Sequence, residues 1–226
     1  MINLPELFPA LYCKCERNDK GSVRFLHCNY PISISTTEYE FIYNLVRENN
    51  LVAGYEVATG TGLSSIAFAE ALRDSNKFGY ILTVDSYIEE TENSCDSYFS
   101  KQDIIRNSKG FEAIRTALNN TGLREYVDLN IGKSPNDVPT IVEEQEMFDY
   151  VFIDAQHTTD ALVADLTAIS PHILNNSFVL IHDIHCFDME TINGKCRELF
   201  GDIPRLAPNC GLDRGGYNLH YLKVKK

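Results

Sequence analysis

Two groups of residues in this sequence have types and spacing suited to chemistry. In the first, a carboxylate precedes alternating small residues: Glu56-Val57-Ala58-Thr59-Gly60-Thr61-Gly62. Glycines at alternate positions let the backbone adopt positive φ angles and come close to a small ligand. The carboxylate can accept hydrogen bonds from a cationic amino group. This turn is therefore expected to hold a small ligand.

The turn departs from two common phosphate-binding patterns. The dinucleotide fingerprint Gly-x-Gly-x-x-Gly needs a third glycine, and Ser65 stands at that position. A Walker loop is excluded because no Gly-Lys-Ser or Gly-Lys-Thr follows. Asp85 ends the next apolar run, where a carboxylate can bind both hydroxyls of a ribose. The sequence thus favours a nucleoside ligand over a purely structural turn.

The second group follows two later apolar runs. Asp154 ends the run FDYVFID and is followed by His157, while His182 and Asp183 lie in the run SFVLIHDI. Oxygen and nitrogen ligands that converge in this way can hold Mg²⁺, or Mn²⁺ where an imidazole joins them. With an ordinary pKa of about 6.5, His157 could also accept a proton at neutral pH. We interpret His185 as a loop or pocket-wall residue.

Both groups belong to a chain in which strand and helix patterns alternate. Strands are expected at 51–58, 80–85, 126–131, 148–154, 177–184 and 217–224, and helices at 64–75, 110–122, 136–145, 158–169 and 188–200. Ser35 and Glu38 form a capping box that begins a further helix of about fourteen residues. The strand-helix-strand order requires parallel strands. The last strand alternates and ends in lysines, as edge strands do.

Composition limits the classes of function. With 226 residues, the chain is expected to form a single domain, 1–226, with an irregular N-terminal arm at 1–33 and a core at 34–226. A net charge of −12 argues against nucleic acid as a partner. No apolar run is long enough to span a membrane. The sequence shows no secretory signal, and its seven irregularly spaced cysteines fit reduced thiols, so a cytoplasmic location is expected.

The two groups together resemble a known family. Glu56, Ala58, Gly60 and Gly62 resemble the first motif of class I S-adenosylmethionine-dependent methyltransferases, Asp/Glu-x-Gly-x-Gly-x-Gly, with alanine in place of the first glycine. The run from FDYVFIDAQH to LIHDIH resembles the metal-dependent small-molecule O-methyltransferases of the macrocin, mycinamicin and cephalosporin-pathway type. The resemblance extends from about residue 34 to the end. It implies an α/β, Rossmann-like, doubly wound and mostly parallel seven-stranded sheet, with helices on both faces and an antiparallel C-terminal strand.

The resemblance also implies roles for individual residues. S-adenosylmethionine would contact residues of the turn and of the strand ends: Glu56, Ala58, Thr59, Gly60, Gly62, Ser64, Asp85, Ser86, Ser134 and Asp154. Mg²⁺ or Mn²⁺ would bind Asp154, His182 and Asp183, and the catalytic residues would be Asp154 and His157, with His157 as the base. Two positions depart from the family pattern. His182 stands where relatives have glutamate, and Asn175-Asn176 replaces a Gly-Gly turn, although asparagine tolerates the left-handed region.

The predicted function is methyl transfer to a hydroxyl of a small molecule. A catalytically inactive S-adenosylmethionine-binding protein and a nicotinamide-dependent oxidoreductase remain as alternatives. The retained cluster argues against the first, and the missing third glycine and Tyr-x-x-x-Lys pair argue against the second. A homodimer is expected from family habit and the aromatic arm. Acceptor choice is assigned to that arm, to the loop or lid at 86–103 and to the loop CGLDRGG.

Overall fold

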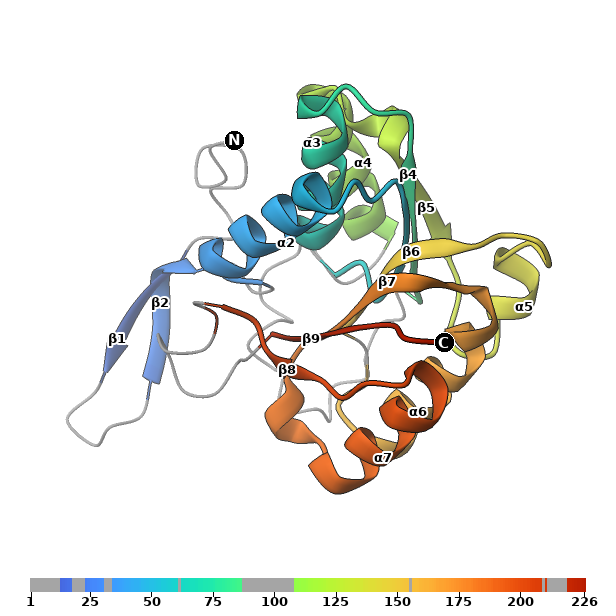
Figure 1. Ribbon diagram of the computed structural model, residues 1–226. Helices are drawn as coiled ribbons and strands as arrows, with labels where there is room; N and C mark the ends of the chain where they lie inside the picture. The colour runs from blue at the N-terminus through green and yellow to red at the C-terminus, as the bar shows by residue number, and fades with distance from the viewer. Residues whose placement is uncertain are drawn as a thin grey trace.

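A seven-stranded sheet forms the centre of the protein, in the order β5-β4-β3-β6-β7-β9-β8 (Figure 1). This computed structural model describes residues 13–17, 23–30, 34–60, 62–86, 108–154, 156–208, 210 and 219–226. The strands are β3 (Ala53–Val57), β4 (Tyr80–Asp85), β5 (Val127–Ile131), β6 (Phe148–Ile153), β7 (Ile173–Ile181), β8 (Arg205–Leu206) and β9 (His220–Lys223). Strands β3 to β7 pair in parallel, and β9 runs antiparallel to β7. The predicted fold class is confirmed.

Helices cover both faces of the sheet (Figure 1). On one face lie α2 (Thr36–Glu48), α3 (Leu63–Asp74) and α4 (Ser108–Thr121), and on the other α5 (Val138–Ile141), α6 (Thr159–Ile169) and α7 (Met189–Phe200). Short 3-10 helices occupy Arg124–Tyr126, Ser170–His172 and Ile184–Cys186. Each face has its own apolar core, so most strand residues are buried whichever way they point.

The strand order reverses at β3, because β4 pairs with one edge of β3 and β6 with the other. In open α/β sheets ligands bind beyond the carboxyl ends of the strands at such a point. Side chains alternate between the two faces, and Tyr55 and Val57 belong to the core beneath α6 and α7. Glu56 therefore points to the face covered by α2 and α3.

Local sequence signals set several boundaries. The capping box of α2 is confirmed, because Glu38 N–H donates to Ser35 Oγ at 3.3 Å and Ser35 N–H donates to Glu38 Oε2 at 2.7 Å. Asn176 has a φ of +68°, so it adopts the left-handed region expected of it. It lies inside β7, however, at an irregularity in the pairing with β6, and not in a turn before that strand. The Asn176 N–H donates to Val224 O at 3.0 Å, which ties this part of β7 to the C-terminal segment.

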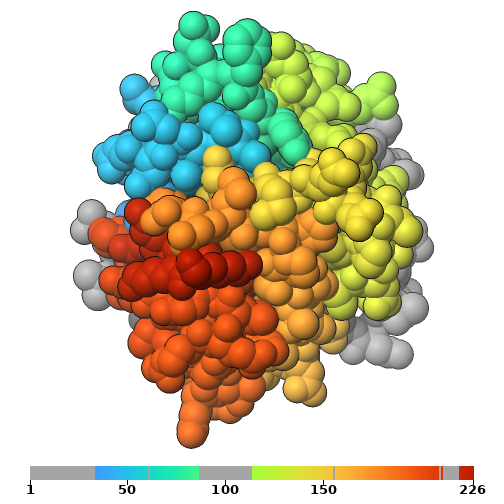
Figure 2. All heavy atoms as spheres, turned by 45° about the vertical axis from the view of Figure 1, so that its right-hand side comes forward, coloured from blue at the N-terminus to red at the C-terminus, as the bar shows by residue number. Residues whose placement is uncertain are grey.

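Two expectations about the ends of the chain are wrong. The described residues of the N-terminal arm form an antiparallel hairpin of β1 (Cys13–Arg17) and β2 (Val23–Tyr30) instead of an irregular segment. Strand β9 is not at the edge, because the two-residue β8 pairs with its outer side. The lysines that suggested an edge lie at the end of β9 and beyond it, where Lys225 N–H donates to Phe200 O at 2.7 Å. These last residues lie along the surface beside α7 (Figure 2).

The predicted loop or lid at 86–103 lies outside the described residues apart from Ser86, and so does the loop CGLDRGG apart from Cys210. Within the described part of the chain, no helix combines the length and apolar character that crossing a membrane requires.

Candidate active site

The glycine turn joins the end of β3 to α3 through left-handed residues. The φ angles are +68° at Ala58, +50° at Gly60 and +78° at Gly62, which is the N-cap of α3. Gly60 N–H donates to Asp85 Oδ2 at 2.9 Å, and Gly62 N–H donates to Thr59 O at 2.7 Å. The turn is thereby fixed against the end of β4. Ala58 adopts a conformation that glycine adopts at lower energy, in keeping with the glycine of the family motif.

Glu56 lies directly beneath this turn and is completely buried. Ser64 and Ser65 hydroxyls donate to its two carboxylate oxygens, and Thr83 Oγ1 donates to Oε2 at 2.5 Å. Burial raises the pKa of Glu56 to about 7, and the three hydroxyl donors oppose this rise. The carboxylate thus connects β3, β4 and the first turn of α3.

The predicted cofactor residues fall into two layers. Glu56, Thr59, Gly62 and Ser64 are buried. The Ser64 hydroxyl donates to Glu56, and Thr59 Oγ1 lies 2.7 Å from Thr83 Oγ1 of β4. Ala58, Gly60, Asp85 and Ser86 are partly exposed at the carboxyl edge of the sheet. A carboxylate oxygen can accept more than one hydrogen bond. Contact between Glu56 and the amino group of a ligand therefore stays a prediction. The partly exposed residues are the ones whose surface a ligand can reach.

Ser134, predicted near the adenine, follows β5 and is half-buried. Its hydroxyl donates to Asp165 Oδ1 at 2.6 Å. Asp165 belongs to α6 and is almost fully buried, which raises the pKa of its carboxyl. Ser134 therefore fixes the loop after β5 to α6, and its contact with a ligand stays a prediction.

The second group forms a close cluster at the ends of β6 and β7. His182 Nδ1 lies 3.3 Å from Asp154 Oδ1 and 3.5 Å from Asp183 Oδ1. His157 Nε2 lies 3.1 Å from Asp183 Oδ2 and 3.6 Å from Asp154 Oδ1. The His182 side chain is 4% exposed, whereas His157 is 47% exposed. The structure thus brings all four predicted residues together, with His157 facing solvent.

The cluster fits a divalent cation. One ligand atom each from Asp154, His182 and Asp183 lies within 4.8 Å of the other two. His182 Nδ1 and Asp183 Oδ1 are buried and lack hydrogen bonds of good geometry, although their distances suit ion pairs. Asp183 also has a left-handed φ of +49°, an unfavourable conformation that proteins often place at functional sites. Buried polar atoms without hydrogen bonds are costly, and a bound cation would satisfy them.

The charges of the cluster change the expectation for His157. The nearby carboxylates of Asp154 and Asp183 raise the pKa of His157 to about 10, so the ordinary value near 6.5 does not hold. Although burial opposes it, the charge of Asp154 likewise raises the pKa of His182 well above its usual range. Burial raises the pKa of Asp183, but the two imidazoles of His157 and His182 lie close enough to outweigh burial, so this pKa is below its usual value. Without a cation, the two imidazolium ions supply the positive charge that balances the carboxylates.

Sequence reasoning missed three residues of these two groups. Ser65 and Thr83 contact Glu56, and Glu38 Oε1 lies 3.3 Å from His182 Nε2. Period-two alternation could have placed Thr83 on the same face as Glu56 once their register was known. The sequence carried no signal for Glu38, since the capping box already explained its presence.

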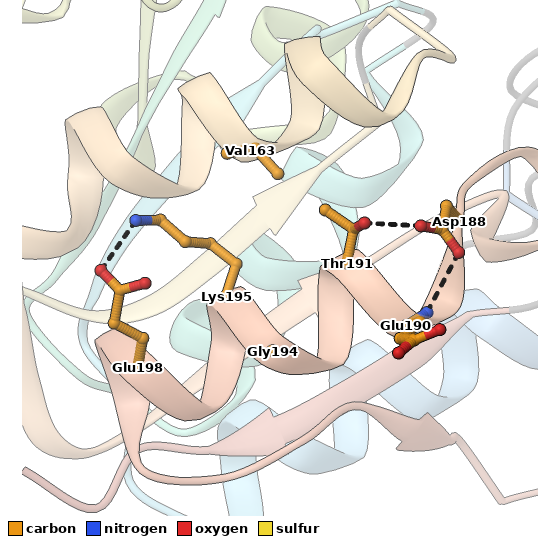
Figure 3. A pocket seen from close by; sticks show the side chains of 7 residues that line it. All are labelled: Val163, Asp188, Glu190, Thr191, Gly194, Lys195 and Glu198. Carbon is orange, nitrogen blue, oxygen red and sulfur yellow. Dashed lines mark hydrogen bonds and ion pairs between the residues drawn. The ribbon is translucent and has the colours of Figure 1, made fainter.

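A surface hollow between α6 and α7 lies apart from this chemistry (Figure 3). None of the predicted site residues lines it. Its polar side chains are largely paired with each other, as in the contact of Lys195 Nζ with Glu198 Oε1 at 2.9 Å and of Thr191 Oγ1 with Asp188 Oδ2 at 2.5 Å. We therefore assign the site to the strand ends.

Solved structures of several methyltransferases resemble this fold. The O-methyltransferase NovP has a TM-score of 0.63 and 17% identity, over 88% of this chain and 85% of that chain. The O-methyltransferase TomG from Streptomyces achromogenes, in complex with S-adenosylmethionine, has a TM-score of 0.59 and 17% identity, over 86% and 82%. An O-methyltransferase from Bacillus cereus, in complex with S-adenosylhomocysteine, has a TM-score of 0.58 and 17% identity, over 88% and 85%. At these identities the likeness concerns the fold.

A search of curated proteins finds no match. The family described as "Methyltransferase domain" matches residues 56–184, more than half of the chain. The match begins at the buried glutamate of the glycine turn and ends just after Asp183, so it spans both groups of residues. The chain therefore belongs to the methyltransferase-domain family and has the fold of class I S-adenosylmethionine-dependent methyltransferases.

Proposed function

We propose that the protein transfers a methyl group from S-adenosylmethionine to a hydroxyl of a small molecule, with help from a divalent cation at Asp154, His182 and Asp183. One observation carries the proposal. The glycine turn and the Asp-His cluster lie at the ends of the adjacent strands β3 and β6, where Asp154 N–H donates to Val57 O at 3.2 Å. A methyl donor at the turn and an acceptor at the cluster would thus be neighbours. The family favours this reading over the nicotinamide alternative.

Each group of residues has a distinct task in this proposal. The partly exposed backbone of Ala58 and Gly60 and the carboxylate of Asp85 bind and orient the donor. Mg²⁺ or Mn²⁺, when bound, lowers the pKa of an acceptor hydroxyl. Asp154, His182 and Asp183 would hold this cation, and the carboxylate charges that otherwise keep His157 protonated would then be offset. His157, exposed at the rim of the cluster, then accepts the proton of the hydroxyl.

Calorimetric titration tests donor binding first. We expect S-adenosylmethionine to bind the wild-type protein and to bind Asp85→Asn more weakly. A matched control is Asp128→Asn, since Asp128 is an exposed carboxylate of the neighbouring strand β5. Absence of binding by the wild-type protein, with and without Mg²⁺, would contradict the proposal.

Methyl transfer itself is tested by release of S-adenosylhomocysteine with a panel of phenols, catechols and sugar hydroxyls. We expect product with at least one class of hydroxyl, and its loss on addition of EDTA or in Asp183→Asn. Donor binding without turnover on any hydroxyl would favour the inactive binding protein. Activity that survives EDTA would remove the cation from the proposal. The predicted homodimer can be measured by sedimentation of the same samples.

A further inference from the structure

Glu38 belongs to neither predicted group of functional residues, yet it reaches the cluster from α2. It lies in the first turn of α2 and is 3% exposed. Its Oε1 lies 3.3 Å from His182 Nε2, and its Oε2 accepts a hydrogen bond from Ser35 N–H at 2.7 Å. The helix cap therefore fixes the carboxylate in one orientation, with its other oxygen directed at the imidazole.

The two nitrogens of His182 face different partners. Nδ1 is directed at the carboxylates of Asp154 and Asp183, and Nε2 is directed at Glu38. A histidine that binds a metal through one nitrogen commonly donates its other N–H to a carboxylate, which fixes the tautomer and makes the ligand nitrogen more basic. Glu38, His182 and the two aspartates have this arrangement.

We propose that Glu38 is the outer partner of a carboxylate-histidine-metal triad, in which His182 binds the divalent cation through Nδ1 and donates Nε2–H to Glu38. This inference deepens the proposed function and rests on its cation. Glu38 acts as a positioning residue, because it contacts His182 and neither the donor nor the acceptor. It adds a third negative charge to those of Asp154 and Asp183 and so compensates for the use of a neutral imidazole as ligand.

Burial supports this assignment. Glu38 Oε1 and His182 Nε2 are both inaccessible to water and lack a hydrogen bond of good geometry. A buried carboxylate needs a hydrogen-bond donor. When the lone pair of His182 Nδ1 binds the cation, the proton is on Nε2, and Nε2–H would donate to Glu38 after a small rotation of the imidazole. Two further neighbours within the described part of the chain, Cys210 and Phe152, carry no competing charge at neutral pH.

The test is calorimetric titration of Mn²⁺ into the full chain and its variants. Glu38→Gln keeps the size of the side chain and removes its charge, so we expect Mn²⁺ affinity to fall by about 10- to 100-fold. Ser35→Ala removes a capping hydroxyl and leaves the Glu38 carboxylate, and Glu70→Gln changes another fully buried glutamate, on α3. Both controls are expected to bind Mn²⁺ within about twofold of the wild-type protein, because neither changes Glu38 or His182.

Nitrogen NMR of the histidine rings gives a readout independent of activity. On addition of Mg²⁺ we expect the Nδ1 resonance of His182 to shift in the wild-type protein, with the proton held on Nε2. If Glu38→Gln binds Mn²⁺ as tightly as the wild-type protein does, the triad is overturned and Glu38 acts only in the helix cap. If Glu38→Gln does not fold, Glu38→Asp keeps the charge but shortens its reach, and undiminished affinity there would overturn the triad equally.

A wild-type protein that binds no Mn²⁺ would overturn both the triad and the cation of the proposed function. A separate measurement of S-adenosylmethionine binding would then show whether the protein binds the methyl donor even though it binds no cation. Cation binding with no effect of Glu38→Gln would refute the triad alone. The two failures are therefore distinguishable.

Discussion

The ionisation state of the Glu56 carboxylate provides a direct test of the structure. This carboxylate is completely buried, and its pKa rises from 4.5 to about 7 because burial outweighs the hydroxyl donors Ser64, Ser65 and Thr83. Glu56→Gln keeps nearly the same shape but cannot ionise. The variant therefore separates the effect of ionising this side chain from the effect of removing it.

The sign and size of the effect follow from proton linkage. Since the folded protein binds this proton more tightly than the unfolded chain, stability falls with rising pH wherever the proton is held only in the folded state. The contribution of Glu56 is full below pH 4.5 and is lost as pH rises to about 7. Each pKa unit corresponds to about 1.4 kcal/mol, so the loss across this window is about 3 kcal/mol.

Urea unfolding of wild type and Glu56→Gln, measured at intervals from about pH 4.5 to 8, gives the free energy of unfolding of each. We expect the wild-type protein to lose about 3 kcal/mol relative to the variant across this range, since the other titrating groups contribute equally to both. A difference that stays constant with pH would refute the reasoning, because it would mean that Glu56 is ionised throughout. Ser64→Ala removes one donor and should move the window to higher pH.

Three further predictions concern single residues. Ala58→Gly should raise the free energy of unfolding by up to about 1 kcal/mol, seen as a higher Tm, because φ is +68° there; an unchanged or lower Tm would contradict this. His157→Ala should lower kcat by on the order of 100-fold or more while donor binding is kept, with exposed His185→Ala as the control in the same kinetic assay. Ser134→Ala should destabilise the fold by about 1–3 kcal/mol in urea unfolding, since it removes a donor from buried Asp165; a loss of donor affinity alone would assign Ser134 to the ligand instead.

Apolar periodicity was sufficient to predict most of the fold. The parallel strands are nearly continuous apolar runs because both faces of the sheet are covered, and the helices between them force parallel pairing. Strand β8 could not be predicted in this way, since it has two residues, Arg205 and Leu206, and both are exposed. Because β8 was missed, β9 was wrongly placed at the edge.

The sequence could predict only those parts of the candidate site that lie at the ends of strands. Asp154 and His182 end neighbouring parallel strands, so their approach follows from topology. The contact between Glu38 and His182 depends on how α2 crosses the sheet, which no local pattern encodes. The raised pKa of His157 could not be predicted from the sequence either, because it depends on distances to two carboxylates and not on the spacing of residues in the chain.

The two groups of residues act on one another through charge as well as through position. Burial is the main reason that the pKa of Glu56 is raised, but the negative charge of Asp154 adds to the rise. A cation bound by Asp154 would reduce this contribution, the smallest of the five, and so favour the ionised form of Glu56 beneath the glycine turn. An ionised Glu56 attracts the cationic amino group of a methyl donor more strongly than a neutral one. Cation and donor should therefore favour each other's binding, and by linkage each must do so by the same factor.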